Sequence, residues 1–142
     1  MTVKHILDQK GRNVVTVSPT MVTEEAVRFL ADNKIGAVVV TGPGGKIAGI
    51  LSERDIVRAV AKKGAAALTA PISDIMTSKV TTCGQSHSVN QVMELMTNGR
   101  FRHLPVEEGG KLIGIISIGD VVRRRIEDVE REAAEIKAYI AS

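Results

Sequence analysis

Aromatic residues are nearly absent from this 142-residue chain, which has no tryptophan, one tyrosine and two phenylalanines. Proteins that bind single-stranded nucleic acids stack the bases on aromatic rings, so this composition argues against such a partner. Hydrophobic residues still make up 44% of the chain. The core must therefore be built from Val, Ile, Leu, Ala and Met, and we expect a folded domain.

The chain has one cysteine, Cys83, and so it cannot form an internal disulfide. No segment reaches the roughly 18 consecutive apolar residues of a membrane-spanning helix. The first residues also lack the apolar stretch of a signal peptide. Together these absences predict a cytoplasmic protein that does not enter a membrane.

Groups suited to catalysis or metal binding are scarce as well. The histidines, His5, His87 and His103, have neither the mutual spacing nor the cysteine partners of a metal site. Cys83 has no base beside it in the sequence, and no glycine-rich phosphate-binding loop joins a strand to a helix. We therefore expect neither a metal site nor an enzymatic activity.

The net charge of +3 is a mild excess that suits a partner carrying phosphates. Basic residues gather around Arg100 and Arg102 and again at 123–125. Such clusters are usually solvated faces. A nucleic-acid binder that uses the second cluster is one alternative, and it predicts affinity that falls steeply with salt.

An internal repeat organises the chain. Residues 49–57 (GILSERDIV) return as residues 114–122 (GIISIGDVV), 65 positions later (114 minus 49). A Gly-Gly-Lys turn precedes each copy, at 44–46 and at 109–111. Two copies are too few for a solenoid, so we predict a pair of motifs related by pseudo-twofold symmetry.

Each copy has the same predicted order of elements, β-α-β-β-α. In the first copy the patterns predict a strand at 14–17, a helix at 23–33 that Thr23 caps, strands at 37–40 and 46–51, and a helix from Ser52 to about Gly64. In the second copy they predict strands at 80–83, 102–106 and 111–116, and helices at 88–98 and from Ser117 onward.

The last helix is predicted to continue to about Ile140, well beyond its counterpart. Its apolar residues are spaced alternately four and three apart, as in the a/d seam of a coiled coil: Val122, Ile126, Val129, Ala133, Ile136 and Ile140. Such a stripe predicts a partner chain. The alternative is that the helix folds back over its own sheet.

The order of elements, with Gly-x-x-Ser-x-x-Asp before each final helix, resembles the CBS motif, here twice over. The stretches 75–77 (IMT) and 103–106 (HLPV) are also similar to that family. The resemblance covers nearly the whole chain and implies an α/β CBS pair, or Bateman module, like the stand-alone bacterial tandem-CBS proteins. It implies a first motif at 1–62, a linker at 63–71, a second motif at 72–122 and a helical extension at 123–142.

The residues themselves indicate a ligand site at the start of each final helix. A Ser at the N-cap offers a hydroxyl at the positive end of the helix dipole, where an Asp three residues later is stabilised. That carboxylate can accept hydrogen bonds from two vicinal hydroxyls, as a ribose presents them. Ser-x-x-Asp is also an ordinary capping pattern, but here it occurs twice, as Ser52 with Asp55 and as Ser117 with Asp120.

The resemblance implies two clefts in which the Asp of one motif works with segments of the other. The first cleft would join Ser52 and Asp55 to Ile75, Met76, Thr77 and Val80 around an adenine, with Arg102 and His103 facing phosphates. The second would join Ser117 and Asp120 to Ile6, Leu7 and the strand that contains Thr16. The second is the poorer cleft in this scheme, because the acidic Asp8 stands where the first has Thr77.

Three arginines are further candidates for contact with a phosphate. Arg100 and Arg102 alternate in a predicted strand and would share a face, so at least one of them can reach a ligand. A guanidinium can hold a phosphate with two hydrogen bonds. Arg54 is the third candidate, and its alternative is a plain position on the helix surface.

The sequence thus predicts a regulatory module that senses an adenine nucleotide (AMP, ADP, ATP or NAD(H)) and signals by a change of conformation. No catalytic cofactor is expected. We also expect a homodimer and an unidentified protein target. The main alternative is a structural dimerisation module that binds no ligand.

Overall fold

A computed structural model describes all residues from Met1 to Ser142, and they form two compact units. The unit that holds both termini, here the terminal unit, comprises Met1–Asn13, Thr82–Glu108 and Ile113–Ser142. The central unit comprises Val14–Thr81 and Gly109–Leu112. Neither unit is one continuous stretch of sequence, so the helix at the start of the chain belongs with the second repeat.

The central unit contains a three-stranded sheet. Strand β1 (Thr16–Val17) runs parallel to β2 (Ala37–Thr41), which pairs antiparallel with β3 (Ile47–Ser52). Helices α2 (Thr23–Asp32) and α3 (Glu53–Lys63) follow β1 and β3, and short 3₁₀ turns lie at Pro43–Gly45, Gly64–Thr69 and Ile72–Asp74. The middle strand β2 is the most deeply buried of the three, and it packs with Leu30 and Leu51 in the core.

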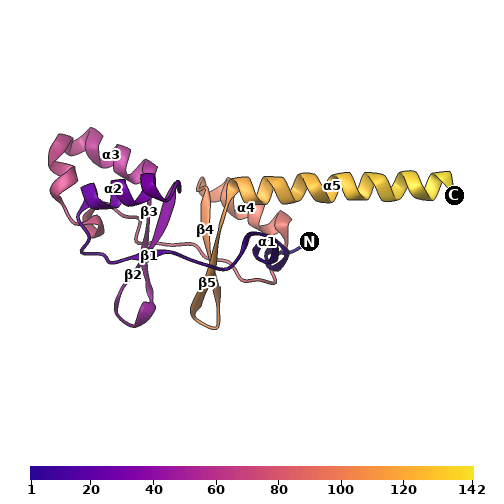
Figure 1. The fold of residues 1–142 in the computed structure, drawn as a ribbon, viewed down its shortest axis with the longest axis horizontal. Coiled ribbons are helices and arrows are strands. Elements are labelled where there is room, and N and C mark those ends of the chain that lie inside the picture. Colours follow the sequence, from indigo (N-terminus) through magenta and orange to yellow (C-terminus); the bar gives the residue numbers. More distant parts are fainter. The chain divides into compact units, whose positions relative to one another are not determined.

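The terminal unit contains the second sheet, formed by β4 (His103–Glu108) and β5 (Lys111–Ser117). Helices α1 (Val3–Lys10) and α4 (Val89–Gly99) both pack against the beginning of α5 (Ile118–Ala141), which continues past them (Figure 1). The core beneath these helices includes Leu7, Met96, Leu104 and Ile116, none of them more than 2% exposed. The predicted α/β fold with two similar motifs and a long final helix is confirmed.

The glycine that opens each repeat is required by a close approach of the chain. In the central unit, Thr77 and Ile50 exchange two backbone hydrogen bonds of 2.9 Å, and a Cβ on Gly49 would lie 2.7 Å from the Thr77 carbonyl oxygen. In the terminal unit, a Cβ on Gly114 would lie 2.7 Å from Leu7 Cδ2. Any larger residue would push away the segment that leads into each Ser-x-x-Asp site.

Several predicted boundaries are wrong. The predicted strand at 80–83 is reduced to a single bridge between Cys83 and Val106, and the strand at 14–17 keeps only Thr16 and Val17, the residues that find partners on β2. The predicted linker at 63–71 is not among these errors; it contains the 3₁₀ turn Gly64–Thr69 and buries Ala67 completely.

Thr23 and Arg100 do not have the local structure that the sequence predicts for them. Val22, rather than Thr23, is the N-cap of α2, and the buried Thr23 hydroxyl donates to the Ala70 carbonyl at 2.8 Å. Arg100 ends α4 in a left-handed conformation with φ 56°, and β4 begins only at His103. Arg100 and Arg102 therefore do not alternate along a strand.

Candidate functional site

The two Ser-x-x-Asp sequences form nearly identical helix caps, as predicted. At the start of α3, Ser52 Oγ accepts from Asp55 N at 3.3 Å, and Asp55 Oδ2 accepts from Ser52 N at 3.0 Å. At the start of α5, Ser117 Oγ accepts from Asp120 N at 3.1 Å, and Asp120 Oδ2 accepts from Ser117 N at 2.8 Å. Each carboxylate is thereby fixed at the positive end of its helix.

The side chains that donate to Asp55 are hydroxyls. Thr77 Oγ1 donates to Asp55 Oδ1 at 3.1 Å, and Ser52 Oγ donates to Asp55 Oδ2 at 3.1 Å. Met76 lies against the neighbouring Gly49. Ser52, Asp55, Met76 and Thr77 thus lie together in the central unit, where they present hydroxyls and a half-buried carboxylate.

The surroundings of Asp120 carry positive charge. Lys10, the last residue of α1, forms an ion pair with Asp120 in which Nζ lies 2.6 Å from Oδ2. The same ammonium donates to the Ile115 carbonyl at 2.8 Å. The Asp120 side chain is 15% exposed and that of Lys10 is 37% exposed. Solvent therefore reaches the pair mainly from the lysine side.

Asp120 remains ionised at neutral pH. Burial acts to raise the pKa of its carboxyl, but the hydrogen bonds from Lys10 and from the Ser117 backbone, with the charge of Lys10, outweigh that effect. The net result is a pKa below the ordinary value for Asp. The site therefore offers a permanent negative charge at the mouth of a positively charged helix end.

A cavity of about 310 Å³ opens beside this ion pair. Its walls are formed by residues of α1 and of the first turns of α5, all in the terminal unit: Ile6, Gln9, Lys10, Asp120, Arg123 and Arg124. Lys10 pairs with Asp120, and Arg124 pairs with acidic residues of its own helix, whereas Arg123 forms no ion pair within the chain. The unbalanced positive charge of Arg123 favours an anionic guest in the cavity.

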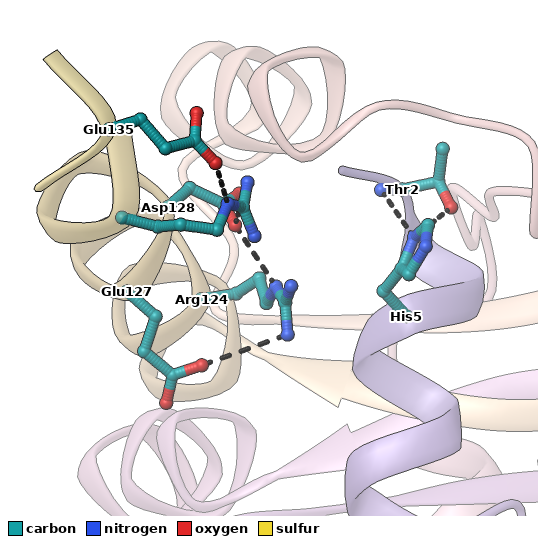
Figure 2. Close-up of polar contacts among 7 residues, drawn as sticks. Thr2, His5, Arg124, Glu127, Asp128 and Glu135 are labelled. Atoms are coloured by element: carbon teal, nitrogen blue, oxygen red, sulfur yellow. Dashed lines mark hydrogen bonds and ion pairs between the residues drawn. The ribbon is translucent and has the colours of Figure 1, made fainter. Parts of the chain in front are cut away.

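Arg124 is held in place by acidic residues of its own helix. Its guanidinium lies 3.7 Å from a Glu127 oxygen and 3.3 Å from Asp128 Oδ1, and both contacts are drawn in Figure 2. The Asp128 side chain is only 6% exposed, and it also pairs with Arg131 at 3.5 Å. At the far side of the same view, the His5 ring contacts Thr2, whose backbone N donates to Nδ1 at 3.2 Å at the start of α1.

The other predicted site residues are divided between the units. Ile6 lines the cavity, whereas Leu7 is fully buried in the core. Four of the remaining candidates lie in the central unit: Thr16, Arg54, Ile75 and Val80. The other three lie in the terminal unit: Arg100, Arg102 and His103. The predicted grouping of Arg102 and His103 with Asp55, and of Thr16 with Asp120, stays a prediction.

Sequence reasoning missed four of the residues that line the cavity, namely Gln9, Lys10, Arg123 and Arg124. A signal was present, because Lys10 recurs as Lys79 in the segment before the second repeat, and Arg123 recurs as Arg58 after Asp55. The acidic Asp8, expected to harm this site, is bound by Arg12 at 2.6 Å. That hydrogen bond lowers the pKa of the exposed Asp8 carboxyl.

Groups that could support other chemistry are not gathered at either site. Burial raises the pKa of the Cys83 thiol to about 12, so the thiol is not a nucleophile at neutral pH. No cluster of three or more His, Cys, Asp or Glu side chains has the arrangement of a metal site. None of the helices combines the length and the apolar character needed to cross a membrane.

Comparison with known proteins places these features in a family context. The CBS domain profile matches residues 3–62 and 72–127. The chain is 34% identical over 149 aligned residues to the mitochondrial CBS domain-containing protein CBSX3 of Arabidopsis thaliana, with 98% of this chain and 71% of that protein covered. The CBS-domain-containing protein ATU1752 of Agrobacterium tumefaciens has the same fold, with a TM-score of 0.85, 55% identity, and 87% and 92% of the two chains covered.

Two further structures of similar fold contain ligands. The CBS domain protein PAE2072 of Pyrobaculum aerophilum is complexed with AMP, and it is 30% identical, with a TM-score of 0.75 over 84% of this chain and 89% of that one. The CBS domain pair of protein MJ0100 is complexed with 5′-methylthioadenosine and S-adenosyl-L-methionine, with 25% identity and a TM-score of 0.80 over 90% and 98% of the two chains. Both ligand sets contain adenosine.

Proposed function

This chain belongs to the CBS domain family, and from that premise we propose that it is a regulatory module that binds a phosphate-bearing adenosine ligand at Asp120. The observation that carries the proposal is the cavity beside Asp120, whose lining combines this fixed carboxylate with its partner Lys10 and with Arg123, which forms no ion pair within the chain. The AMP complex of PAE2072 supports the adenosine part of the proposal, because that protein shares the fold and the family.

Asp120 is suited to hold the ribose. Its Oδ2 atom accepts from Ser117 N and Lys10 Nζ. A carboxylate can accept up to about four hydrogen bonds, so capacity remains for two vicinal hydroxyls. The cap fixes the side chain before the ligand arrives, which reduces the entropy lost on binding.

The cations decide between classes of adenosine ligand. AMP, ADP, ATP and NAD(H) bring phosphates that Lys10 and Arg123 can neutralise with charge-assisted hydrogen bonds. S-adenosylmethionine brings a sulfonium and an ammonium against a single carboxylate, so its net charge is positive and the same residues favour it less. The cavity at Asp120 therefore favours the phosphate-bearing ligands, whereas the hydroxyls that donate to Asp55 suit an adenosine moiety without that requirement.

Signalling would begin at the Lys10–Asp120 ion pair. A ribose that binds Asp120 competes with the ammonium, and a phosphate attracts Lys10 away from it. Lys10 ends α1, and Asp120 lies in the first turn of α5, so the exchange alters the contact between these helices. A ligand shifts a conformational equilibrium only by binding one state more tightly, and this exchange supplies such a difference.

A homodimer in the cytoplasm is part of the proposal, with a separate protein as the target of the signal. Large apolar side chains remain exposed in the single chain, including Val57 on α3 at 67% and Ile136 on α5 at 60%. These faces also support the alternative function, a dimerisation module with unfilled sites. The nucleic-acid alternative is weaker, because Arg124 is already paired with Glu127 and Asp128.

Calorimetric titration of the purified chain with AMP, ADP, ATP, NAD+, NADH and S-adenosylmethionine tests the proposal at two salt concentrations. We expect a phosphate-bearing ligand to bind most tightly and Asp120→Ala to weaken that binding by roughly 10- to 100-fold, or about 1.5–3 kcal/mol. Ser88→Ala, which removes the cap of α4 outside the cavity lining, is the control for loss of a cap. If no adenosine compound binds, the structural alternative replaces the proposal.

A further inference from the structure

The second half of α5 is a helix with no partner in the chain. Every residue from Val129 to Ser142 is exposed, and the helix continues past α1 and α4 (Figure 1). The apolar stripe, defined as Val122, Ile126, Val129, Ala133, Ile136 and Ile140, lies along its length. Exposed fractions of its large apolar side chains range from 42% at Val122 to 77% at Ile140, so the helix does not fold back over its own sheet.

The two long sides of α5 differ in how their charges are used. Away from the stripe, Arg124, Asp128, Arg131 and Glu135 form a ladder of ion pairs within the helix, part of which Figure 2 shows. These pairs stabilise an exposed helix by a few tenths of a kcal/mol each. The charges that border the stripe, Arg125, Glu130, Glu132 and Lys137, form no ion pair within the chain.

We infer that two copies of this chain pair along the stripe as a parallel, in-register coiled coil. The apolar residues alone do not set the direction, because an antiparallel pairing also buries all six. In that arrangement Val122 would meet the partner's Ile140, Ile126 the partner's Ile136, and Val129 the partner's Ala133. The choice is made by the bordering charges.

In the parallel arrangement each of these four charges meets its opposite, and Arg123, at the first e position, faces the partner's Ile118. The stripe assigns Arg125 and Glu132 to g positions and Glu130 and Lys137 to e positions, and a g residue faces the next e residue of the partner. Arg125 therefore faces the partner's Glu130, and Glu132 faces the partner's Lys137. Twofold symmetry forms each of these pairs twice.

In the antiparallel arrangement, like charges along the stripe face one another and repel. Residues at e positions then face one another across the seam, as do residues at g positions. Glu130 and Glu132 would each lie opposite their own copy, and Arg123 would lie opposite the partner's Lys137. Like charges at such sites destabilise the pairing, so the parallel direction is favoured.

This arrangement has a consequence for the Asp120 cavity. Asp120 and Arg123 lie in the first two turns of α5, next to Val122 at the start of the stripe. A parallel coil brings the first turns of both copies together, so the two cavities open at the same end of the coil. A change at one cavity can then reach the other through the shared seam.

Disulfide trapping in the full chain tests the direction. Ile136→Cys, in a Cys83→Ala background, places the two new thiols side by side in the parallel dimer. In the antiparallel dimer position 136 lies beside position 126, and the two thiols are about 15 Å apart along the axis at 1.5 Å per residue. We expect Ile136→Cys alone to form a covalent dimer under mild oxidation. Ala134→Cys, on the outer face, is the control that should stay uncrosslinked.

Three results would overturn the inference. They are a crosslink that forms only when Ile126→Cys and Ile136→Cys chains are mixed, equal crosslinking of Ala134→Cys, and a wild-type chain that sediments only as a monomer. A charge exchange gives an independent readout. Arg125→Glu should weaken dimerisation at least about threefold, and adding Glu130→Arg should restore it, because opposite charges then face each other again.

Discussion

The two Ser-x-x-Asp sites of this chain have the same cap but different third partners. Asp55 receives a hydroxyl from Thr77, which lies 22 positions along the chain, whereas Asp120 receives an ammonium from Lys10, which lies 110 positions away. The cap follows from local sequence, and it is the same in both halves. The charge of each site follows from the segment that folds against it, and that segment differs.

The final helices differ for an equally specific reason. Helix α3 ends at Lys63, and Gly64 follows with φ 63°, a conformation that favours glycine. The repeat offset of 65 places Val129 at the equivalent position of α5 (64 plus 65). Without a glycine to end it, α5 continues to Ala141 and carries the exposed stripe.

The largest effect is expected from reversing one charge in the Asp120 cavity. Arg123→Glu should weaken AMP binding by roughly 10- to 100-fold, because a phosphate would lose a charge-assisted hydrogen bond and meet a carboxylate. Calorimetric titration measures this. Arg58→Glu changes the equivalent residue of α3 and should leave the affinity within about threefold. Equal losses in the two variants would remove the distinction between the sites.

Ending α5 where α3 ends should disrupt the dimer. Val129→Gly removes an apolar residue from the stripe and adds the cost of glycine relative to valine in a helix, a few tenths to about 0.5 kcal/mol per chain. Sedimentation should then show dimerisation weakened by at least about tenfold. Ala134→Gly has the larger helix cost, about 1 kcal/mol, but lies outside the stripe and should have the smaller effect on the dimer. If both variants weaken the dimer equally, the stripe is not the interface.

The shared cap predicts similar losses of stability in the two halves. Ser52→Ala and Ser117→Ala each remove the hydroxyl that accepts from the Asp backbone, so each should lower the free energy of unfolding by about 1 kcal/mol. Denaturant titration gives both values. A difference of more than about 1 kcal/mol between them would show that the caps are not equivalent.

The smallest predicted effect is a pH dependence at Asp120. Its folded pKa lies below the ordinary value, so its stabilising contribution is present at neutral pH and is lost as the pH falls through the acid range. The contribution should stay under about 1 kcal/mol, because solvent reaches the Lys10 side of the pair. Between pH 7 and pH 3, the free energy of unfolding should therefore fall less steeply in Asp120→Asn than in the wild-type chain. An unchanged slope would contradict the assigned ion pair.

Local patterns were sufficient to predict much of the fold. The repeat, the caps at Ser52 and Ser117 and the length of α5 depend on residues within a few turns of one another, and the structure confirms them. The prediction of a strand at 80–83 was wrong because only Cys83 finds a partner on β4. The prediction that Arg100 shares a strand face with Arg102 was wrong because the chain reverses direction between α4 and β4, which places Arg100 in a left-handed turn.

The charge of the Asp120 site could not be predicted in the same way. Lys10 meets Asp120 only because α1 packs beside α5 in the terminal unit, a contact between the two ends of the sequence. The recurrence of Lys10 as Lys79 marks the position as part of the repeat. It does not reveal that only one of the two lysines pairs with the carboxylate of its unit.

The central claim is that the Asp120 site selects its ligand by phosphate charge. The direct measurement is the affinity of the wild-type chain, Lys10→Met and the control Lys79→Met for AMP and for 5′-methylthioadenosine, which lacks a phosphate. We predict that Lys10→Met weakens AMP binding by roughly tenfold, as expected for loss of one charge-assisted hydrogen bond, and leaves 5′-methylthioadenosine within about twofold. Lys79→Met should change neither. Equal losses for both ligands in Lys10→Met, or no loss for AMP, would contradict the claim.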